Sequence, residues 1–163
     1  MLYRQQKDFQ KFKCIADKCP KSCCVGWQIV IDDDSLCRYK TANENRIDMF
    51  ASGIDFSESC FKQDKDGRCS MLSDKGLCNL QSEYGEDFLC YTCKTYPRHV
   101  EEFPDVREYS LSLSCPEAVR MLLDTDYGFS IEELEDEVLD TEDYGDFDII
   151  LFDKLVFARD NML

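Results

Sequence analysis

The sequence has no long apolar run, and this excludes one broad class of protein. A helix needs about 20 consecutive apolar residues to cross a bilayer, and no stretch of the 163 residues approaches that length. The first residues, MLYRQQKDFQKFKC, are polar and contain no apolar core of a secretory signal. We therefore exclude an integral membrane protein and expect a protein of the reducing cytoplasm.

Basic residues are scarce, and this argues against nucleic acid as a partner. The 34 Asp and Glu residues outnumber 19 Lys and Arg, for a net charge of −15, whereas a phosphate-binding surface needs clustered cations. Phosphate-binding loops and G-x-G-x-x-G fingerprints do not occur. The single histidine, His99, is the one candidate base for a nucleophilic cysteine, and no orienting third group is identified. We expect His99 to lie in a loop or beside a metal site.

Cysteine, in contrast, is abundant. Eleven cysteines are an odd number, so any scheme of disulfides alone leaves a thiol over. Cytosolic thiols are kept reduced, whereas thiolates bind soft and borderline metal ions well. With 44% apolar residues, the chain also has enough apolar side chains to form one hydrophobic core. The composition predicts a metal-binding domain with metal-bound or free thiols and no disulfides.

The spacing of the cysteines sharpens this prediction. Cys90-x2-Cys93 matches the half-site of zinc ribbons and ferredoxin-like clusters, and the run C-x3-C-C that ends at Cys24 adds a second group. Position 26 is Gly, so a radical enzyme's C-x3-C-x2-C motif is not formed. The alternative is that some thiols are simply buried apolar groups, which we favour for Cys37 and Cys60.

The expected ligands follow from these spacings. Cys90 and Cys93 should bind one metal together, because two intervening residues bring both sulfurs onto one turn. At least one of Cys19, Cys23 and Cys24 should complete that site. Cys23 and Cys24 should differ in role, since adjacent side chains rarely point at the same ion.

Local patterns predict short helices and strands. The β-rich segment from Trp27 to Asp32 predicts a strand, and Asp34 or Ser35 is expected to cap a helix that runs towards Phe50. Asp66-Gly67 predicts a hairpin with Phe61 and Met71-Leu72 on its paired strands. Near the end of the cysteine-rich part, Ser114 and Glu117 form a capping-box pattern with Pro116 in the first helical turn.

The sequence divides into three ranges. We interpret 1–123 as a cysteine-rich metal-binding domain and 124–148, which carries no Lys or Arg, as a solvated acidic connector or frayed helix. In 149–163, Ile149, Phe152 and Val156 recur at helical spacing, and Phe152, Leu155 and Val156 need a surface to cover them. We interpret this range as the start of a truncated helical region and expect self-association through it. The fold class expected is α+β: a small, irregular, metal-stapled domain with short helices and a β-hairpin.

Four segments carry a resemblance to a known family. FKC…C…CCVGWQIVID, DGRCSML…GLCNL, LCYTCKTYPR and SLSCPEAVRML resemble the N-terminal part of bacterial flagellin lysine-N-methylases over residues 12–123. The chain is more distantly similar to the CxxxCxxCC family of zinc- or iron-binding proteins. The resemblance implies a metal centre (an iron–sulfur cluster of the 4Fe-4S type, or zinc), flagellin as the partner and S-adenosylmethionine as the methyl donor.

The resemblance also implies the site residues. The metal-associated positions are Cys14, Cys19, Cys23, Cys24, Cys69, Cys78, Cys90, Cys93 and Cys115. Trp27, Tyr96, Pro97 and Arg98 match flanking family positions, whereas Cys37 and Cys60 have no counterpart. No catalytic residue is assigned. The alternative function is a non-enzymatic zinc- or iron-binding module for protein interaction or metal handling; a pocket lined by Trp27, Tyr96 and Arg98 would favour the enzyme.

Overall fold

The chain forms two compact units. The computed structural model describes residues 1–44, 48–124, 131–135 and 144–162. The sheet unit comprises 1–13, 97–114 and 118–163, and the cysteine unit comprises 14–96 and 115–117. This grouping divides the predicted range 1–123, because its first thirteen residues and 97–114 belong with the sheet.

The sheet unit is built around a mixed sheet. Its elements, with α5 starting inside the cysteine unit, are β1 (Leu2–Gln6), the 3-10 helix η1 (Phe9–Lys11), β4 (Arg98–Phe103), β5 (Val106–Leu111), α5 (Pro116–Leu123), β6 (Ile131–Glu135) and α6 (Ile149–Asp160). The strands lie in the order β4-β5-β1-β6. β5 pairs antiparallel with β4 and parallel with β1, and β1 pairs antiparallel with β6. The N-terminal strand is therefore central, with Tyr3 opposite Arg107.

A hairpin joins β4 and β5 at a place the sequence analysis did not indicate. Phe103 pairs with Val106, so Pro104 and Asp105 form the two-residue turn. Asp105 has φ +56°, a left-handed conformation that Asp tolerates better than most residues. The Leu2 amide donates to the Asp105 carbonyl at 2.6 Å, which connects the turn to β1. A hairpin is thus confirmed as part of the fold class, at this position rather than at Asp66-Gly67.

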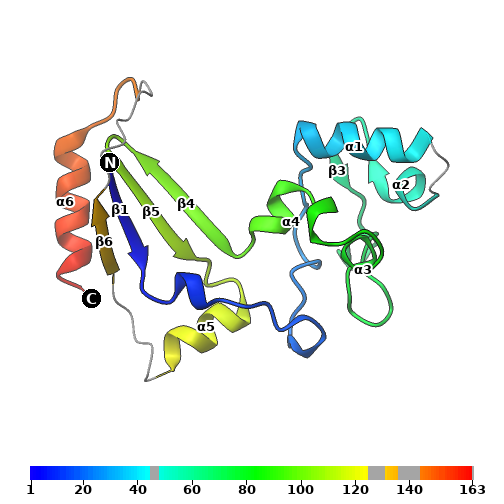
Figure 1. Cartoon of the computed structure of the whole chain (residues 1–163), viewed down its shortest axis with the longest axis horizontal. Coiled ribbons are helices and arrows are strands. Elements are labelled where there is room, and N and C mark those ends of the chain that lie inside the picture. The colour runs from blue at the N-terminus through cyan, green and yellow to red at the C-terminus, as the bar shows by residue number, and fades with distance from the viewer. Residues whose placement is uncertain (45–47, 125–130, 136–143, 163) are drawn as a thin grey trace. The chain divides into compact units, whose positions relative to one another are not determined.

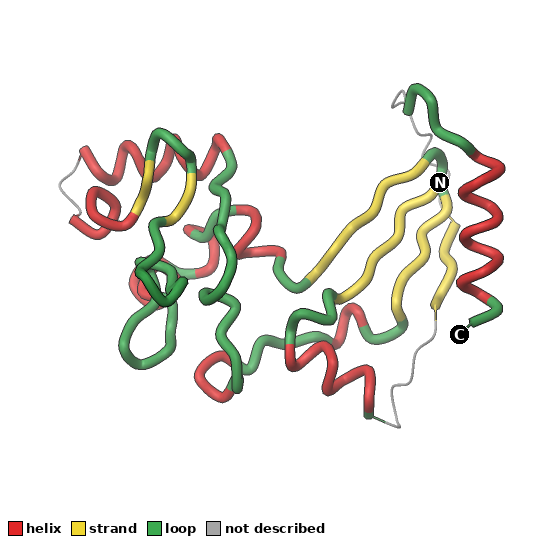
Figure 2. Tube along the Cα trace, turned by 180° about the vertical axis from the view of Figure 1, so that it is seen from behind, coloured by secondary structure: helices red, strands yellow, loops and turns green. Residues whose placement is uncertain are grey.

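Helix α6 lies beside the sheet in both views of the chain (Figures 1 and 2). Asp148 caps it by accepting a hydrogen bond from the Leu151 amide at 3.0 Å. On its inward side, the ring of Phe152 lies 4.7 Å from that of Phe103, and Arg159 binds Glu108 at 2.8 Å. The predicted helix over 149–163 is therefore present, and it carries both apolar and ionic contacts to the strands.

The apolar side chains of α6 are only partly covered. Phe152 and Val156 are half-buried, whereas Leu155 is exposed. Leu155 is not covered within this one chain, because apolar residues occur around the whole circumference of α6 and only one side of it contacts the sheet. Self-association through this region stays a prediction.

The predicted acidic connector, 124–148, lies largely outside the described residues. Within it, Ile131–Glu135 forms strand β6 against β1. Arg4 of β1 binds Glu133 of β6 at 2.8 Å, so part of the acidic run is paired with a cation. The interpretation of the whole range as a solvated linker or helix is therefore wrong for these five residues. No helix in the described part of the chain has both the length and the apolar character needed to span a membrane.

The cysteine unit consists of short helices and turns. Its elements are the 3-10 helix η2 (Ala16–Lys18), α1 (Asp33–Glu44), α2 (Asp48–Gly53), β2 (Ile54–Asp55), β3 (Cys60–Phe61), α3 (Asn79–Tyr84), the 3-10 helix η3 (Glu86–Phe88) and α4 (Tyr91–Thr95). β2 and β3 form a small antiparallel pair. Most of the backbone runs in turns, so this unit relies on side-chain packing.

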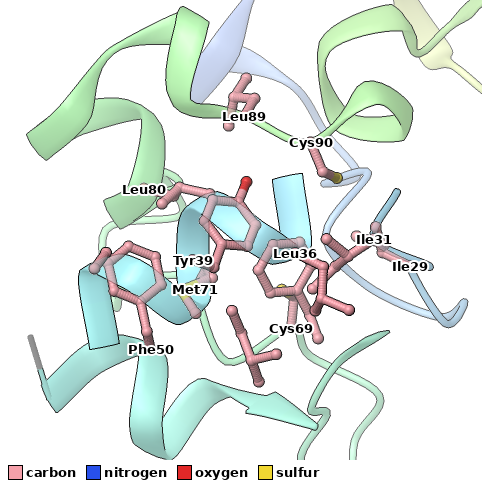
Figure 3. Packing of buried hydrophobic residues seen from close by; sticks show 13 residues of the cluster. Ile29, Ile31, Leu36, Tyr39, Phe50, Cys69, Met71, Leu80, Leu89 and Cys90 are labelled. Carbon is pink, nitrogen blue, oxygen red and sulfur yellow. The ribbon is translucent and has the colours of Figure 1, made fainter. Parts of the chain in front are cut away.

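An aromatic cluster forms the core of the cysteine unit. Tyr39 of α1 and Phe50 of α2 are both 0% exposed, and their rings stack with centroids 5.3 Å apart (Figure 3). The Tyr39 hydroxyl donates to the Phe88 carbonyl at 2.7 Å, which satisfies the one polar group of the ring. Burial raises the pKa of the Tyr39 phenol well above its usual value. The core therefore joins α1, α2 and η3.

Two predictions for this unit are corrected by the structure. The segment from Trp27 to Asp32 is not a strand; it makes only an isolated bridge between Val30 and Cys60, because no neighbouring extended segment continues the ladder. Asp66-Gly67 does lie in a turn, with Gly67 at φ +73°. That turn closes a single bridge between Gln63 and Cys69 rather than a hairpin, and Phe61 pairs with Ile54 instead of the Met71-Leu72 segment.

Asp32 is the N-cap of α1, in place of the predicted Asp34 or Ser35. Its Oδ1 accepts a hydrogen bond from the Ser35 amide at 3.0 Å, which is the standard N-cap bond to the third helical residue. Its Oδ2 accepts from the Tyr91 amide, the first of α4, at 2.7 Å. One carboxylate therefore satisfies the N-terminal amides of two helices, and these bonds lower its pKa although desolvation raises it.

We expect Asp32→Ala to destabilise the cysteine unit by about 1–3 kcal/mol, because both amides lose a charged acceptor. Chemical denaturation followed by the fluorescence of Trp27, the one tryptophan of the chain, measures this change. Asp34→Ala, in the exposed first turn of the same helix, is the matched control and should cost less than half as much. Equal losses in the two variants would contradict the double-cap role.

The predicted helix after Ser114 is present as α5, which begins at Pro116. Proline fits this first position because its missing amide would have no partner inside the helix. Ala118 and Met121 on α5 are 1% and 3% exposed, so one face of this helix is buried.

Candidate metal centre

Every cysteine of the chain belongs to the cysteine unit. Cys14 is the first residue of this unit, and Cys115 lies in its short second segment. All eleven are free thiols. Ten of them therefore come from the continuous segment 14–96, and the eleventh, Cys115, directly precedes α5.

Cys90 and Cys93 lie on the first turn of α4. Cys90 directly precedes the helix and is 0% exposed, while the Lys94 amide donates to its carbonyl at 2.9 Å. The two thiols form a hydrogen bond that lowers the pKa of Cys90 and raises that of Cys93 far above its usual value. The structure therefore brings these two thiols together at the start of α4, and their binding of one metal stays a prediction.

Cys24, Cys69 and Cys78 approach this pair from three other segments. The Cys69 amide donates to the Cys24 carbonyl at 2.8 Å, so a backbone hydrogen bond joins the segments that carry these two cysteines. The Cys78 thiol is hydrogen-bonded to Cys24, and this bond raises the pKa of Cys78. The pKa of Cys93 is also raised by the proximity of Cys24 and Cys78, which places these sulfurs near α4.

We call these five residues the inner thiols: Cys24, Cys69, Cys78, Cys90 and Cys93. They share one apolar environment, since Cys69 and Cys90 belong to the buried core and the other three pack against it. Burial raises the pKa of the Cys69 thiol. The inner thiols thus come from four separate segments, and the fold gathers them at the edge of the aromatic core.

The flanking thiols are Cys14, Cys19, Cys23 and Cys115. Cys23 hydrogen-bonds to Cys24, which lowers the pKa of Cys23 and raises that of Cys24 to about 12. Cys14 and Cys115 also lie near enough to Cys23 to affect its pKa. Cys19 instead donates to the Lys21 carbonyl at 3.1 Å. The adjacent residues Cys23 and Cys24 therefore have different surroundings, the first exposed and the second packed on the core.

Cys37 and Cys60 lie outside both groups. Cys37 is exposed on α1, and Cys60 is a buried residue of β3 whose sulfur accepts a hydrogen bond from Gln28 at 3.0 Å. Cys60 therefore fits the expectation of a buried apolar thiol, whereas the same expectation for Cys37 is wrong, because its side chain is exposed.

The described residues contain no group of three or more His, Cys, Asp or Glu side chains arranged so that it could hold a metal ion as it stands. The donor chemistry nonetheless fits a soft metal, because the inner thiols are numerous and largely shielded from water. The ligand assignment for the nine predicted cysteines stays a prediction.

Three of the four flanking residues that match the family, Trp27, Tyr96 and Arg98, were expected near the site. The ring of Trp27 lies 5.8 Å from that of Tyr96 in the cysteine unit. Arg98 belongs to the sheet unit, where its guanidinium lies over the rings of Phe9 and Phe12. His99, on β4, contacts Glu101 at 2.6 Å and belongs to the sheet unit rather than to the unit of the cysteines. A pocket lined by Trp27, Tyr96 and Arg98 stays a prediction.

The sequence analysis did not identify Asp32 as a residue that positions the candidate metal centre. Its bond to the Tyr91 amide fixes the start of α4, directly after Cys90. The sequence signal was an Asp ahead of a helical pattern, but only the fold shows that the same carboxylate reaches a second helix 59 positions further along.

The chain matches no protein-family model, and no solved structure is similar to it. It is 27% identical over 131 residues to a lysine-N-methylase of Salmonella typhimurium, and 27% identical over 130 residues to one of Salmonella choleraesuis. These matches cover 76% and 75% of this chain but only 33% and 32% of the relatives. The chain thus spans about one third of the length of these two relatives.

A shorter relative gives a more complete match. The flagellar biosynthetic protein FliU of Salmonella muenchen is 30% identical over 120 residues, which is 69% of this chain and 71% of FliU. The resemblance first seen in the cysteine spacing is therefore confirmed by alignment over most of both chains. The chain belongs to the flagellin lysine-N-methylase family.

Proposed function

We propose that this chain is the metal-binding part of a protein-lysine methyltransferase that modifies flagellin, with S-adenosylmethionine as the methyl donor. The observation that carries the proposal is the gathering of the nine family-matched cysteines in one unit, five of them at the edge of one core. The names of the relatives, lysine-N-methylase and a flagellar biosynthetic protein, support the reaction and the substrate.

The inner thiols are the ligands that we propose for the metal. Cys90 and Cys93 supply one half-site, and Cys24 and Cys78 supply the other. Cys69 and the flanking thiols (Cys14, Cys19, Cys23 and Cys115) remain additional candidates. When bound, an iron–sulfur cluster or a zinc ion would cross-link segments that are otherwise connected by turns and a small core.

Methyl transfer to lysine sets requirements on the protein. The ε-amine must lose its proton before its lone pair forms the new N–C bond, while the S–C bond of the sulfonium breaks and the thioether leaves. A site therefore needs to lower the lysine pKa by burial or by a neighbouring base. The net charge of −15 suits a lysine-bearing substrate, because a negative surface raises the local concentration of a cationic partner.

A second candidate is a non-enzymatic zinc- or iron-binding module for protein interaction or metal handling. The position of the inner thiols favours it, because sulfurs packed against a core are suited to a structural metal that has no open coordination position. The two candidates share the metal and differ in whether a methyl group is transferred.

Anaerobic purification followed by iron, zinc and sulfide analysis tests the shared part. We expect metal in near-stoichiometric amount, with a broad visible absorbance and acid-labile sulfide if it is a cluster. Flagellin incubated with the protein and methyl-labelled S-adenosylmethionine tests the enzyme, and label on flagellin lysines is the expected result. Metal without label supports the non-enzymatic module, and absence of metal under these conditions refutes both candidates.

A further inference from the structure

The segment from Trp27 to Asp32 runs along α4 in the opposite direction. The rings of Trp27 and Tyr96 are 5.8 Å apart at one end. Thr92 donates to the Val30 carbonyl at 3.3 Å further along, and Asp32 accepts from the Tyr91 amide at the other end. Three contacts thus hold the segment against the helix that carries Cys93.

This junction exposes large apolar side chains. Trp27 is 39% exposed, Val30 59% and Tyr91 66%. Leu77 is the one other large apolar side chain that is clearly exposed in the described part of the cysteine unit. We define the apolar strip as Trp27, Val30, Tyr91 and Tyr96. Large exposed apolar groups that lie together commonly mark a binding surface.

The indole of Trp27 is held in place although it is exposed. Its Nε1 donates to the Cys23 carbonyl at 2.7 Å, and its own carbonyl accepts a hydrogen bond from the side chain of Gln63. An aromatic side chain held in this way loses little conformational freedom when a ligand contacts it, which favours binding.

Acidic residues adjoin the strip. Asp33 and Asp34 follow directly after the segment and are exposed at the start of α1. Asp87 binds Lys94 of α4 at 2.9 Å, so the nearest cation on the helix already has an acidic partner. An exposed aromatic face beside carboxylates is complementary to a side chain with an aliphatic stem and a cationic end.

We propose that the apolar strip binds a lysine side chain of the substrate protein, with the Trp27 ring against its stem and its ammonium or methylated ammonium group. The proposal rests on the proposed function, since it identifies where lysine would contact this chain. Cation–π attraction to Trp27 holds the ammonium group, while Asp33 and Asp34, beyond the Tyr91 end of the strip, attract the cationic segment at longer range. The strip lies on the same helix as Cys93, so it would bring the lysine-bearing segment close to the thiol centre.

The unique tryptophan makes this proposal directly measurable. The probe is a short Gly-Ser peptide with one lysine, in unmethylated and trimethylated forms, and the same peptide with acetyl-lysine as the uncharged control. We expect both cationic peptides to change the Trp27 fluorescence in a saturable way and the acetylated peptide to bind about tenfold more weakly or not at all. Equal binding of the three peptides would overturn the proposal.

Variants separate the strip from the rest of the surface. With a labelled peptide read by anisotropy, Trp27→Ala and Tyr91→Ala should each weaken binding about three- to tenfold, while Trp27→Phe should retain part of the affinity. Leu77→Ala, which removes an exposed apolar side chain outside the strip, should bind like the unaltered protein. Circular dichroism checks that each variant is folded, and Tyr91→Ala is the safer variant because most of that side chain is in solvent.

The outcome distinguishes this inference from the proposed function. Peptide binding that depends on Trp27, without label transfer to flagellin, would support the strip and refute the enzyme. Label transfer with an unchanged KM for flagellin in Trp27→Ala would support the enzyme and refute the strip.

Discussion

Replacing Cys93 with Ser is expected to release the bound metal and to unfold the cysteine unit. Cys93 is hydrogen-bonded to Cys90 and lies near Cys24 and Cys78, so it belongs to the set that we propose as ligands. A hydroxyl is a poor ligand for soft metals. The binding free energy of a structural metal adds directly to folding and reaches about 10–16 kcal/mol for zinc-finger peptides, so its loss would exceed the stability of most small domains.

Metal content per chain, measured after anaerobic purification together with far-UV circular dichroism, gives the result. The matched control is Cys37→Ser, which changes an exposed thiol on α1 that has no counterpart in the family. We expect the control to keep its full metal content and its helical signal. Equal metal content in the two variants would show that Cys93 is not a ligand.

Replacing Phe50 with Ala is expected to cost about 3–5 kcal/mol of unfolding free energy. Phe50 has no exposed surface, and its ring contacts those of Tyr39, Tyr84 and Phe88 at centroid distances of 5.3, 5.8 and 6.0 Å. Removing the ring leaves a cavity that three other rings line, and stacked neighbours cannot all move to fill it.

Urea denaturation followed by Trp27 fluorescence reports on this unit, because the tryptophan lies within it. Tyr91→Ala is the control, since it also removes an aromatic ring from this unit. Tyr91 is 66% exposed, so its removal should change the stability by less than about 0.5 kcal/mol. A loss below about 1 kcal/mol for Phe50→Ala would mean that the aromatic cluster is not the core that its burial indicates.

Two predicted helices are present. α5 begins at the predicted proline, and α6 has the predicted apolar residues at helical spacing, although its cap, Asp148, was not predicted. Both helix starts depend on short-range chemistry. Pro116 has no amide hydrogen, which is harmless at the first position of α5, and the Asp148 carboxylate accepts a hydrogen bond from an amide in the first turn of α6. Such signals are contained in a few adjacent residues and can be interpreted without the rest of the fold.

The strands were predicted poorly because their partners are distant. β1 pairs with β5, about a hundred residues further along the chain, and with β6 from the acidic run. The segment from Trp27 to Asp32 has strand-like composition, yet it makes only one bridge to the two-residue strand β3 and lies against α4 as well. β-Propensity describes how side chains fit a pleated surface, so it cannot establish whether such a surface is nearby.

By itself, the sequence determined the α+β class, the abundance of thiols, the Cys90-x2-Cys93 spacing and the family, because these depend on composition and on spacing along one segment. Only the tertiary structure decided that Cys24 and Cys78 accompany that half-site, that Asp32 caps two helices, and that Trp27 and Tyr91 lie along one exposed strip. The physical reason is that these relations join segments up to about seventy residues apart. Their proximity results from packing around Tyr39 and Phe50, which no local pattern specifies.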